Sequence, residues 1–247
     1  MVEWLFAPID PSRAHDVDFF VSWHARAMVL AWGILAPLAV LIARFFKVLP
    51  GQDWPREVDN LVWWRSHWIG QSVVLGLTAI GLSLVLPLNL AAMSLHNWLG
   101  LVLTSFLVLQ VLLGLFRGSK GGPTEPNLRG HHYDMTRWRH AFEVLHKALG
   151  YTALLLAMIV ILTGLWKANG PVWMWVSLLL WWCGLIAVFA AFQKRGMAID
   201  TYQAIWGADL KHPGNQLPHP GWGVRRWKEP EEEADVRSDR GDGVRSH

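Results

Sequence analysis

The chain has 247 residues, of which 53% are apolar, and its formal net charge at pH 7 is only +3. The apolar residues gather in two long runs without Asp, Glu, Lys or Arg, 66–116 and 168–193, a pattern that excludes an ordinary water-soluble globular domain. The single cysteine, Cys183, excludes an intrachain disulfide and a thiolate metal cluster. Basic residues flank the apolar runs, so they indicate membrane topology, and nucleic acid is not expected as a partner.

The hydropathy pattern predicts an all-α integral membrane protein with five transmembrane helices, because a helix of about 20 apolar residues crosses the bilayer core. The five helices are expected at 19–46, 61–87, 93–117, 138–166 and 171–193. Residues 1–18 show no removable signal peptide and are expected to form a periplasmic segment. Residues 194–227 are expected to fold against the cytoplasmic face, and the charged tail 228–247 is expected to be disordered.

Lysine and arginine are unevenly shared between the two sides of the membrane. One side carries little more than Arg13, Arg26 and Lys167, whereas the other carries the basic loops after the first and third helices and the basic C-terminal residues. Cytoplasmic loops are enriched in Lys and Arg. The sequence therefore predicts a multi-pass protein of a bacterial inner membrane, surrounded by lipid, with a periplasmic N-terminus and a cytoplasmic C-terminus.

Four histidines lie near the starts of the first four helices: His24, His67, His96 and His146. Consecutive helices run in opposite directions, so His24 and His96 are expected at the outer level and His67 and His146 at the inner level. A single such histidine is more often an interfacial residue, but ionisable groups at membrane depth are costly and usually functional. Four of them at two matching depths favour two sites, each with two imidazoles on one haem iron.

Glycines recur in phase with these histidines. Gly70, Gly100 and Gly150 follow His67, His96 and His146 by one helical turn, and Gly114 and Gly164 follow the last two by five turns, on the same helix face. Glycine lets neighbouring groups approach a membrane helix closely, either for helix packing or for a flat macrocycle. We expect these five glycines to make room for haem. Arg65, two residues before His67, is expected to neutralise a haem propionate, with simple interfacial anchoring as the alternative.

Three stretches resemble the cytochrome b561 family, in the bacterial form whose transmembrane domain is also found attached to DOMON domains. "HARAMVLAWGILAPLAVLIARFF" resembles the first core helix, "SLHNWLG" resembles a Ser-Leu-His-x-Trp-x-Gly motif, and "HHYDMTRWRHAFEVLHKALGY" is similar to the segment that leads into the fourth core helix. The resemblance covers about residues 17–193 and implies a b561-type domain at 19–193. It implies a four-helix bundle with two haem b, held by His24 with His96 and by His67 with His146.

The resemblance implies transmembrane electron transfer, from a cytoplasmic-side or quinone-pool donor to a periplasmic acceptor. Relatives often move electrons from ascorbate to ferric ions or to an oxidised ascorbate radical. The identity of the donor (an ascorbate-like reductant, a quinol or a redox protein) stays open, and so does a homodimer. Two other functions stay open as well. One is a haem-bearing membrane anchor of a larger periplasmic dehydrogenase or reductase, and the other is a histidine-based metal transporter.

Overall fold

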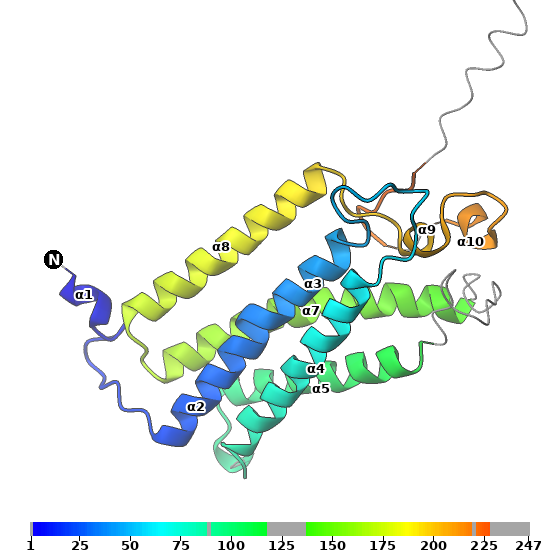
Figure 1. Cartoon of the computed structure of the whole chain (residues 1–247). Coiled ribbons are helices and arrows are strands. Elements are labelled where there is room, and N and C mark those ends of the chain that lie inside the picture. Colours follow the sequence, from blue (N-terminus) through cyan, green and yellow to red (C-terminus); the bar gives the residue numbers. More distant parts are fainter. Residues whose placement is uncertain (1, 88–89, 118–136, 219–220, 228–247) are drawn as a thin grey trace, which may run out of the picture.

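The computed structural model describes residues 2–87, 90–117, 137–218 and 221–227, and in these residues the regular structure is helical (Figure 1). The long helices are α2 (Phe19–Met28), η1 (Val29–Leu35) and α3 (Ala36–Phe45), which form one continuous rod, then α4 (Val62–Ser83), α5 (Leu95–Leu115), α7 (Arg137–Lys167) and α8 (Val172–Lys194). The shorter elements are α1 (Glu3–Phe6), η2 (Leu90–Ala92), α9 (Thr201–Trp206) and α10 (Pro213–Gln216).

Four of the described helical rods are long and apolar enough to cross a membrane, namely Phe19–Phe45, α5, α7 and α8. The prediction of an all-α membrane protein is therefore confirmed, and the helix bounds lie within a few residues of the predicted ones. The fifth predicted crossing corresponds to α4, which includes Arg65, His67 and Gln71 and is not among the four. A membrane crossing by α4 stays a prediction.

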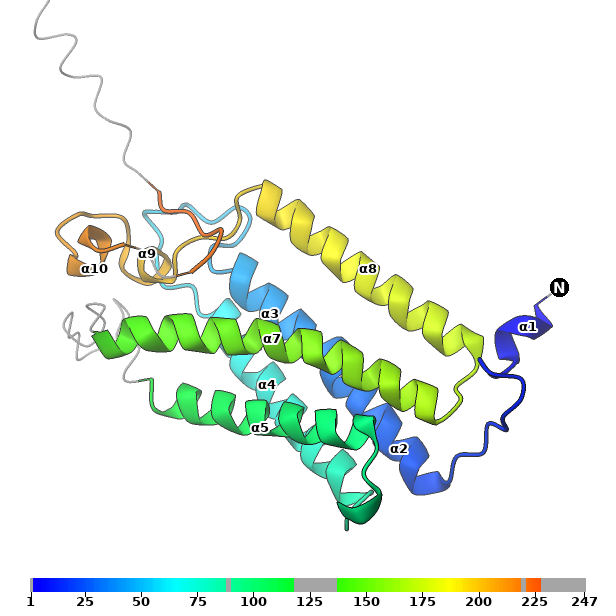
Figure 2. The ribbon, with the colours of Figure 1, turned by 180° about the vertical axis from the view of Figure 1, so that it is seen from behind.

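The bundle consists of two helix pairs and one outlying helix. The α2–η1–α3 rod packs along α4, and α5 packs along α7, as Figure 2 shows from behind. The α4 contact is close because Gly70 and Gly81 have no side chain: a Cβ at Gly70 would lie 2.9 Å from Ala39 Cβ, and one at Gly81 would lie 3.3 Å from Ala27 Cβ. The helix α4 therefore runs antiparallel to the first rod over most of its length.

The first rod contains a π-helical stretch, η1, immediately before Pro37. Pro37 has no amide hydrogen, so it cannot make the helical hydrogen bond to the carbonyl of Gly33. The indole N–H groups of Trp181 and Trp182 on α8 donate to that carbonyl instead, at 2.9 Å and 3.2 Å. The helix break caused by proline thus becomes the attachment point of α8, in the way that membrane proteins satisfy freed backbone groups.

The described residues beyond α8, 195–218 and 221–227, fold back over the end of the bundle where α3 ends and α4 begins (Figure 1). Asp200 caps α9 and pairs with Arg226, whose Nε lies 2.5 Å from Asp200 Oδ2. Lys47, just after α3, donates to the carbonyl of Ile199 at 3.1 Å. Burial lowers the pKa of Lys47 to about 7. We call residues 196–227 the C-terminal cap; the predicted disordered tail, 228–247, lies outside the described residues.

Candidate functional site

The structure brings the four predicted histidines together as two pairs. The imidazole centroids of His24 and His96 are 6.3 Å apart, with the ring planes at 89°. Those of His67 and His146 are 6.1 Å apart, with the planes at 81°. Each pair joins the two halves of the bundle, since one histidine comes from the rod or α4 and the other from α5 or α7.

The spacing within each pair suits a metal bound between the two rings. Two imidazoles on opposite faces of one iron, each through a metal–nitrogen bond of about 2 Å, place their ring centroids about 6 Å apart. Both observed separations agree with that value. Each pair supplies only two ligands, which is what a haem iron requires because the porphyrin supplies the other four nitrogens.

The two pairs lie at opposite ends of the bundle. Nδ1 of His24 donates to the carbonyl of Gly81, 2.8 Å away, and Gly81 follows His67 by 14 residues along α4. Fourteen residues of helix rise about 21 Å. The two pairs therefore stand roughly 20 Å apart along the helix direction.

Backbone carbonyls orient the His24–His96 pair. Nδ1 of His24 lies 2.8 Å from Gly81 O, and Nδ1 of His96 lies 3.0 Å from Val160 O. A carbonyl only accepts hydrogen bonds, so each Nδ1 carries the hydrogen and each Nε2 presents its lone pair. A metal-binding histidine usually donates its other ring N–H to a carbonyl or carboxylate in this way, and the contact sets both the tautomer and the ring direction.

The His67–His146 pair is arranged differently. Nδ1 of each ring is buried, and neither makes a hydrogen bond of ordinary geometry to any residue that the structure describes. The carbonyl of Ala39, on the adjacent rod, nevertheless lies close enough to interact with His67. Phe142 stacks on the His146 ring, with centroids 5.1 Å apart. Buried polar atoms without partners are uncommon in native proteins, and this pair thus differs from His24 and His96, whose rings are oriented by backbone carbonyls.

Three of the five predicted glycines either make room for a histidine or have open space beside them. A Cβ at Gly164 would lie 2.7 Å from Cε1 of His96, so Gly164 makes room for the imidazole itself. Gly100 and Gly114 on α5 have no neighbouring heavy atom within 4 Å of a Cβ position among the described residues, which leaves open space on that helix. The residues present therefore fit a haem at each pair.

The other two glycines contact protein. Gly70 faces Ala39 across the α3–α4 contact, and a Cβ at Gly150 would lie 3.1 Å from Nε2 of Gln110 on α5. In the structure both glycines allow close helix packing, the alternative reading of such glycines. A role for them in haem binding stays a prediction.

The charged residues near His146 form a buried ion triad. Arg139 and Lys147 each donate to Glu143 at 2.7 Å, and the Arg139 and Glu143 side chains are only 5% and 8% exposed. The predicted propionate partner Arg65 is exposed and has no ion pair within the described residues. Sequence reasoning did not predict this triad, although its spacing of four residues on a helix is a recognisable signal.

Two buried hydrogen bonds inside the bundle were also missed. Gln110 Nε2 donates to the carbonyl of His146 at 2.9 Å, and Trp32 Nε1 donates to Thr78 Oγ1 at 3.0 Å. Gln110 is the only amide side chain in the apolar run from Leu101 to Phe116, which was the available signal. An uncompensated amide in a membrane helix is costly, so its presence indicates a partner.

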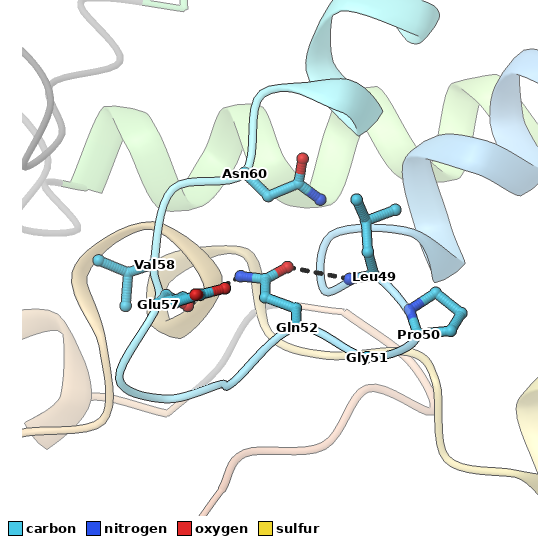
Figure 3. A pocket seen from close by; sticks show the side chains of 7 residues that line it. All are labelled: Leu49, Pro50, Gly51, Gln52, Glu57, Val58 and Asn60. Carbon is cyan, nitrogen blue, oxygen red and sulfur yellow. Dashed lines mark hydrogen bonds between the residues drawn. The ribbon is translucent and has the colours of Figure 1, made fainter.

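One hollow of about 560 Å³ lies in the loop between α3 and α4 (Figure 3). Gln52 holds the loop together, because its amide accepts from Leu49 N at 3.0 Å and donates to Glu57 O at 2.8 Å. None of the predicted site residues lines this hollow. The paired histidines, rather than the hollow, therefore mark the functional site.

Comparison with known proteins finds one family model that covers the paired histidines. A family model described as eukaryotic cytochrome b561 matches residues 23–170, a range that contains all four paired histidines. No curated protein and no solved structure matches the chain. The family carries b-type haem and transfers electrons across membranes. The match spans more than half of the chain and confirms the resemblance seen in the sequence: the chain belongs to the cytochrome b561 family.

Proposed function

We propose that this protein carries electrons across a membrane between two bis-histidine b haems, one held by His24 and His96 and the other by His67 and His146. The observation that carries the proposal is the 6.3 Å and 6.1 Å separations of the paired imidazoles at the two ends of one bundle. Bound haem supplies the one-electron chemistry; the protein supplies ligands, spacing and a dry surround.

The bundle core supports this role. Between the two histidine pairs it is filled by apolar side chains from every helix pair, among them Ala31, Val74, Leu103, Ala157 and Ile161. Such packing excludes water and fixes the separation of the two pairs. The described residues contain no group of three or more His, Cys, Asp or Glu side chains placed for a metal ion, so the paired histidines match haem ligation better than the relay of a metal transporter.

The direction of the chain in the membrane is part of the proposal. The basic residues of the α3–α4 loop and of the C-terminal cap support a cytoplasmic position for the His67–His146 pair and a periplasmic position for the His24–His96 pair, in a bacterial inner membrane, because cytoplasmic segments are enriched in Lys and Arg. This topology requires α4 to be a fifth crossing, and its antiparallel contact along the first rod supports that. Electrons would then enter from a cytoplasmic-side or quinone-pool donor and leave to a periplasmic acceptor.

A vesicle assay tests the proposal. Purified protein is reconstituted into lipid vesicles loaded with ascorbate, and the reduction of external ferricyanide is followed by absorbance. We expect rapid reduction by the wild type, and reduction at the rate of protein-free vesicles by His67→Ala and by His96→Ala, because each variant lacks one of the two sites. His140→Ala removes an exposed histidine of α7, the helix that also carries His146, and should reduce ferricyanide at the wild-type rate. Equal rates for wild type and protein-free vesicles would contradict the proposal.

A further inference from the structure

Three of the four paired histidines have a backbone acceptor on a neighbouring helix beside them. His24 on the first rod contacts a carbonyl of α4, and His96 on α5 contacts a carbonyl of α7. His67 on α4 has the Ala39 carbonyl of the first rod beside it. Each of these three histidines thus faces an acceptor on the helix with which its own helix is paired. By the same pattern, the acceptor for His146 on α7 should come from α5.

The only polar side chain that α5 is seen to hold against His146 is that of Gln110. Its Nε2 donates to the backbone carbonyl of His146 at 2.9 Å. Because a carbonyl cannot donate, this contact fixes the orientation of the amide and leaves Oε1 as the free end. Oε1 is buried and has no hydrogen-bond partner in the described part of the chain.

The absence of a side chain at residue 150 makes this contact possible. In a helix the carbonyl of residue 146 points toward residue 150, and any larger side chain there would cover it. Gly150 leaves it accessible, with Gln110 Nε2 only 3.1 Å from the position of a Cβ. The glycine one turn after His146 therefore lets Gln110 approach the backbone of the histidine closely.

Two complementary polar atoms without partners thus belong to residues that already touch. A histidine that binds iron through Nε2 carries a hydrogen on Nδ1 and needs an acceptor for it. His146 Nδ1 and Gln110 Oε1 are both buried and both unsatisfied within the described residues. We propose that Gln110 is the positioning residue for the haem at the His67–His146 pair, with its Oε1 accepting the Nδ1 hydrogen of His146. This inference rests on the function proposed above.

Redox potentiometry of the purified, haem-loaded protein tests this role. Gln110→Met keeps the length of the side chain and removes both polar atoms. We expect it to raise the midpoint potential of the haem at the His67–His146 pair and to leave the other haem unchanged, because an imidazole without an acceptor donates less electron density to ferric iron. Gln110→Glu retains an acceptor oxygen and should give a potential at or below the wild-type value. The His96→Ala variant should keep only the haem at the His67–His146 pair. Its midpoint potential therefore identifies which of the two wild-type values belongs to that haem.

Ser105→Ala is the matched control. Ser105 also lies on α5, but it is exposed and its hydroxyl donates to Leu101 O of its own helix at 3.0 Å, so neither potential should change. Loss of this haem in Gln110→Met with retention in Gln110→Glu would also support the role. An unchanged potential in Gln110→Met, an equal shift in the Met and Glu variants, or haem loss in both would overturn it. If the wild type itself lacks a haem at this pair, the proposed function fails, and not this inference alone.

Discussion

Among the five glycines predicted to make room for haem, Gly164 leaves the least space for a side chain. Its α hydrogen faces the His96 ring, and a methyl group there would lie 2.7 Å from Cε1 and 3.1 Å from Nδ1 of that ring. These distances are shorter than van der Waals contact. The imidazole would have to move, and it would then lose the contact with the Val160 carbonyl that orients it.

We therefore expect Gly164→Ala to weaken haem binding at the His24–His96 pair by about 10- to 100-fold, the usual cost of losing a hydrogen bond that orients a metal-binding histidine. The haem at the other pair should be retained. Haem titration of the apoprotein followed by visible absorption measures both sites. Gly184→Ala on α8, where a Cβ meets nothing within 4 Å among the described residues, is the control. Unchanged affinity in Gly164→Ala would show that the His96 ring lies elsewhere in the loaded protein.

Lys47 predicts a pH dependence of stability. Its pKa falls from 10.5 in the unfolded chain to about 7 in the folded protein, chiefly through burial, with Lys147 and Arg44 lowering it and Glu143 and Asp200 opposing them. Between pH 7 and about 10 the unfolded chain binds more protons at this site, so stability rises with pH through this window.

Lys47→Met removes the titrating group, so the wild type should gain thermal stability relative to this variant between pH 7 and pH 9. The gain follows from the free energy of placing an ammonium group in a buried site, which is on the order of a few kcal/mol. Unfolding temperatures in detergent measure it. Lys211→Met, at an exposed position, should show no such difference. A constant difference between wild type and Lys47→Met across these pH values would contradict the burial of the charged form.

At the level of secondary-structure elements, the C-terminal cap depends on one ion pair. Arg226 binds Asp200 and also donates to the carbonyls of Gly214 and Asn215 at 2.9 Å and 3.1 Å. Asp200 in turn caps α9, whose six residues are all buried. The pair therefore joins both ends of the cap, and removal of one partner leaves the other charge buried.

Arg226→Gln is expected to destabilise the cap by about 3–5 kcal/mol, the usual cost of breaking a buried ion pair. Limited proteolysis should then cleave after Lys194 sooner than in the wild type, while the bundle remains intact. Arg56→Gln breaks the ion pair between Arg56 and Asp53, whose side chains are 86% and 63% exposed, and should cleave like the wild type. Equal cleavage of the wild type and Arg226→Gln would indicate that other contacts hold the cap.

The sequence predicts the positions of the helices well, but it predicts less well which groups on other helices they contact. Apolar length is a property of one segment, so the five helices could be located within a few residues. The π-helical stretch could not be predicted, because the groups that satisfy the Gly33 carbonyl, Trp181 and Trp182, lie some 150 positions further along the chain. The phase of a glycine predicts which helix face is open but not what fills it: His96 at Gly164, Ala39 at Gly70 and Gln110 at Gly150.

For the molecule as a whole, the two ends of the bundle are chemically similar but not equivalent. The His24–His96 pair has both imidazoles bonded to backbone carbonyls, whereas at the His67–His146 pair the acceptor that we propose for His146 is the side-chain amide of Gln110. Haems bound at two sites whose histidines have different hydrogen-bond partners should differ in potential. Such a difference would give electrons a preferred direction across the membrane.

Haem stoichiometry decides whether both sites exist. Pyridine haemochrome spectra and protein determination on purified wild type, His67→Ala and His96→Ala count the haems bound per chain. We expect two haem b in the wild type and one in each variant, since each substitution removes one axial ligand of one iron. A wild type with a single haem or none, or a His67→Ala variant that still binds two, would contradict the assignment of the four histidines.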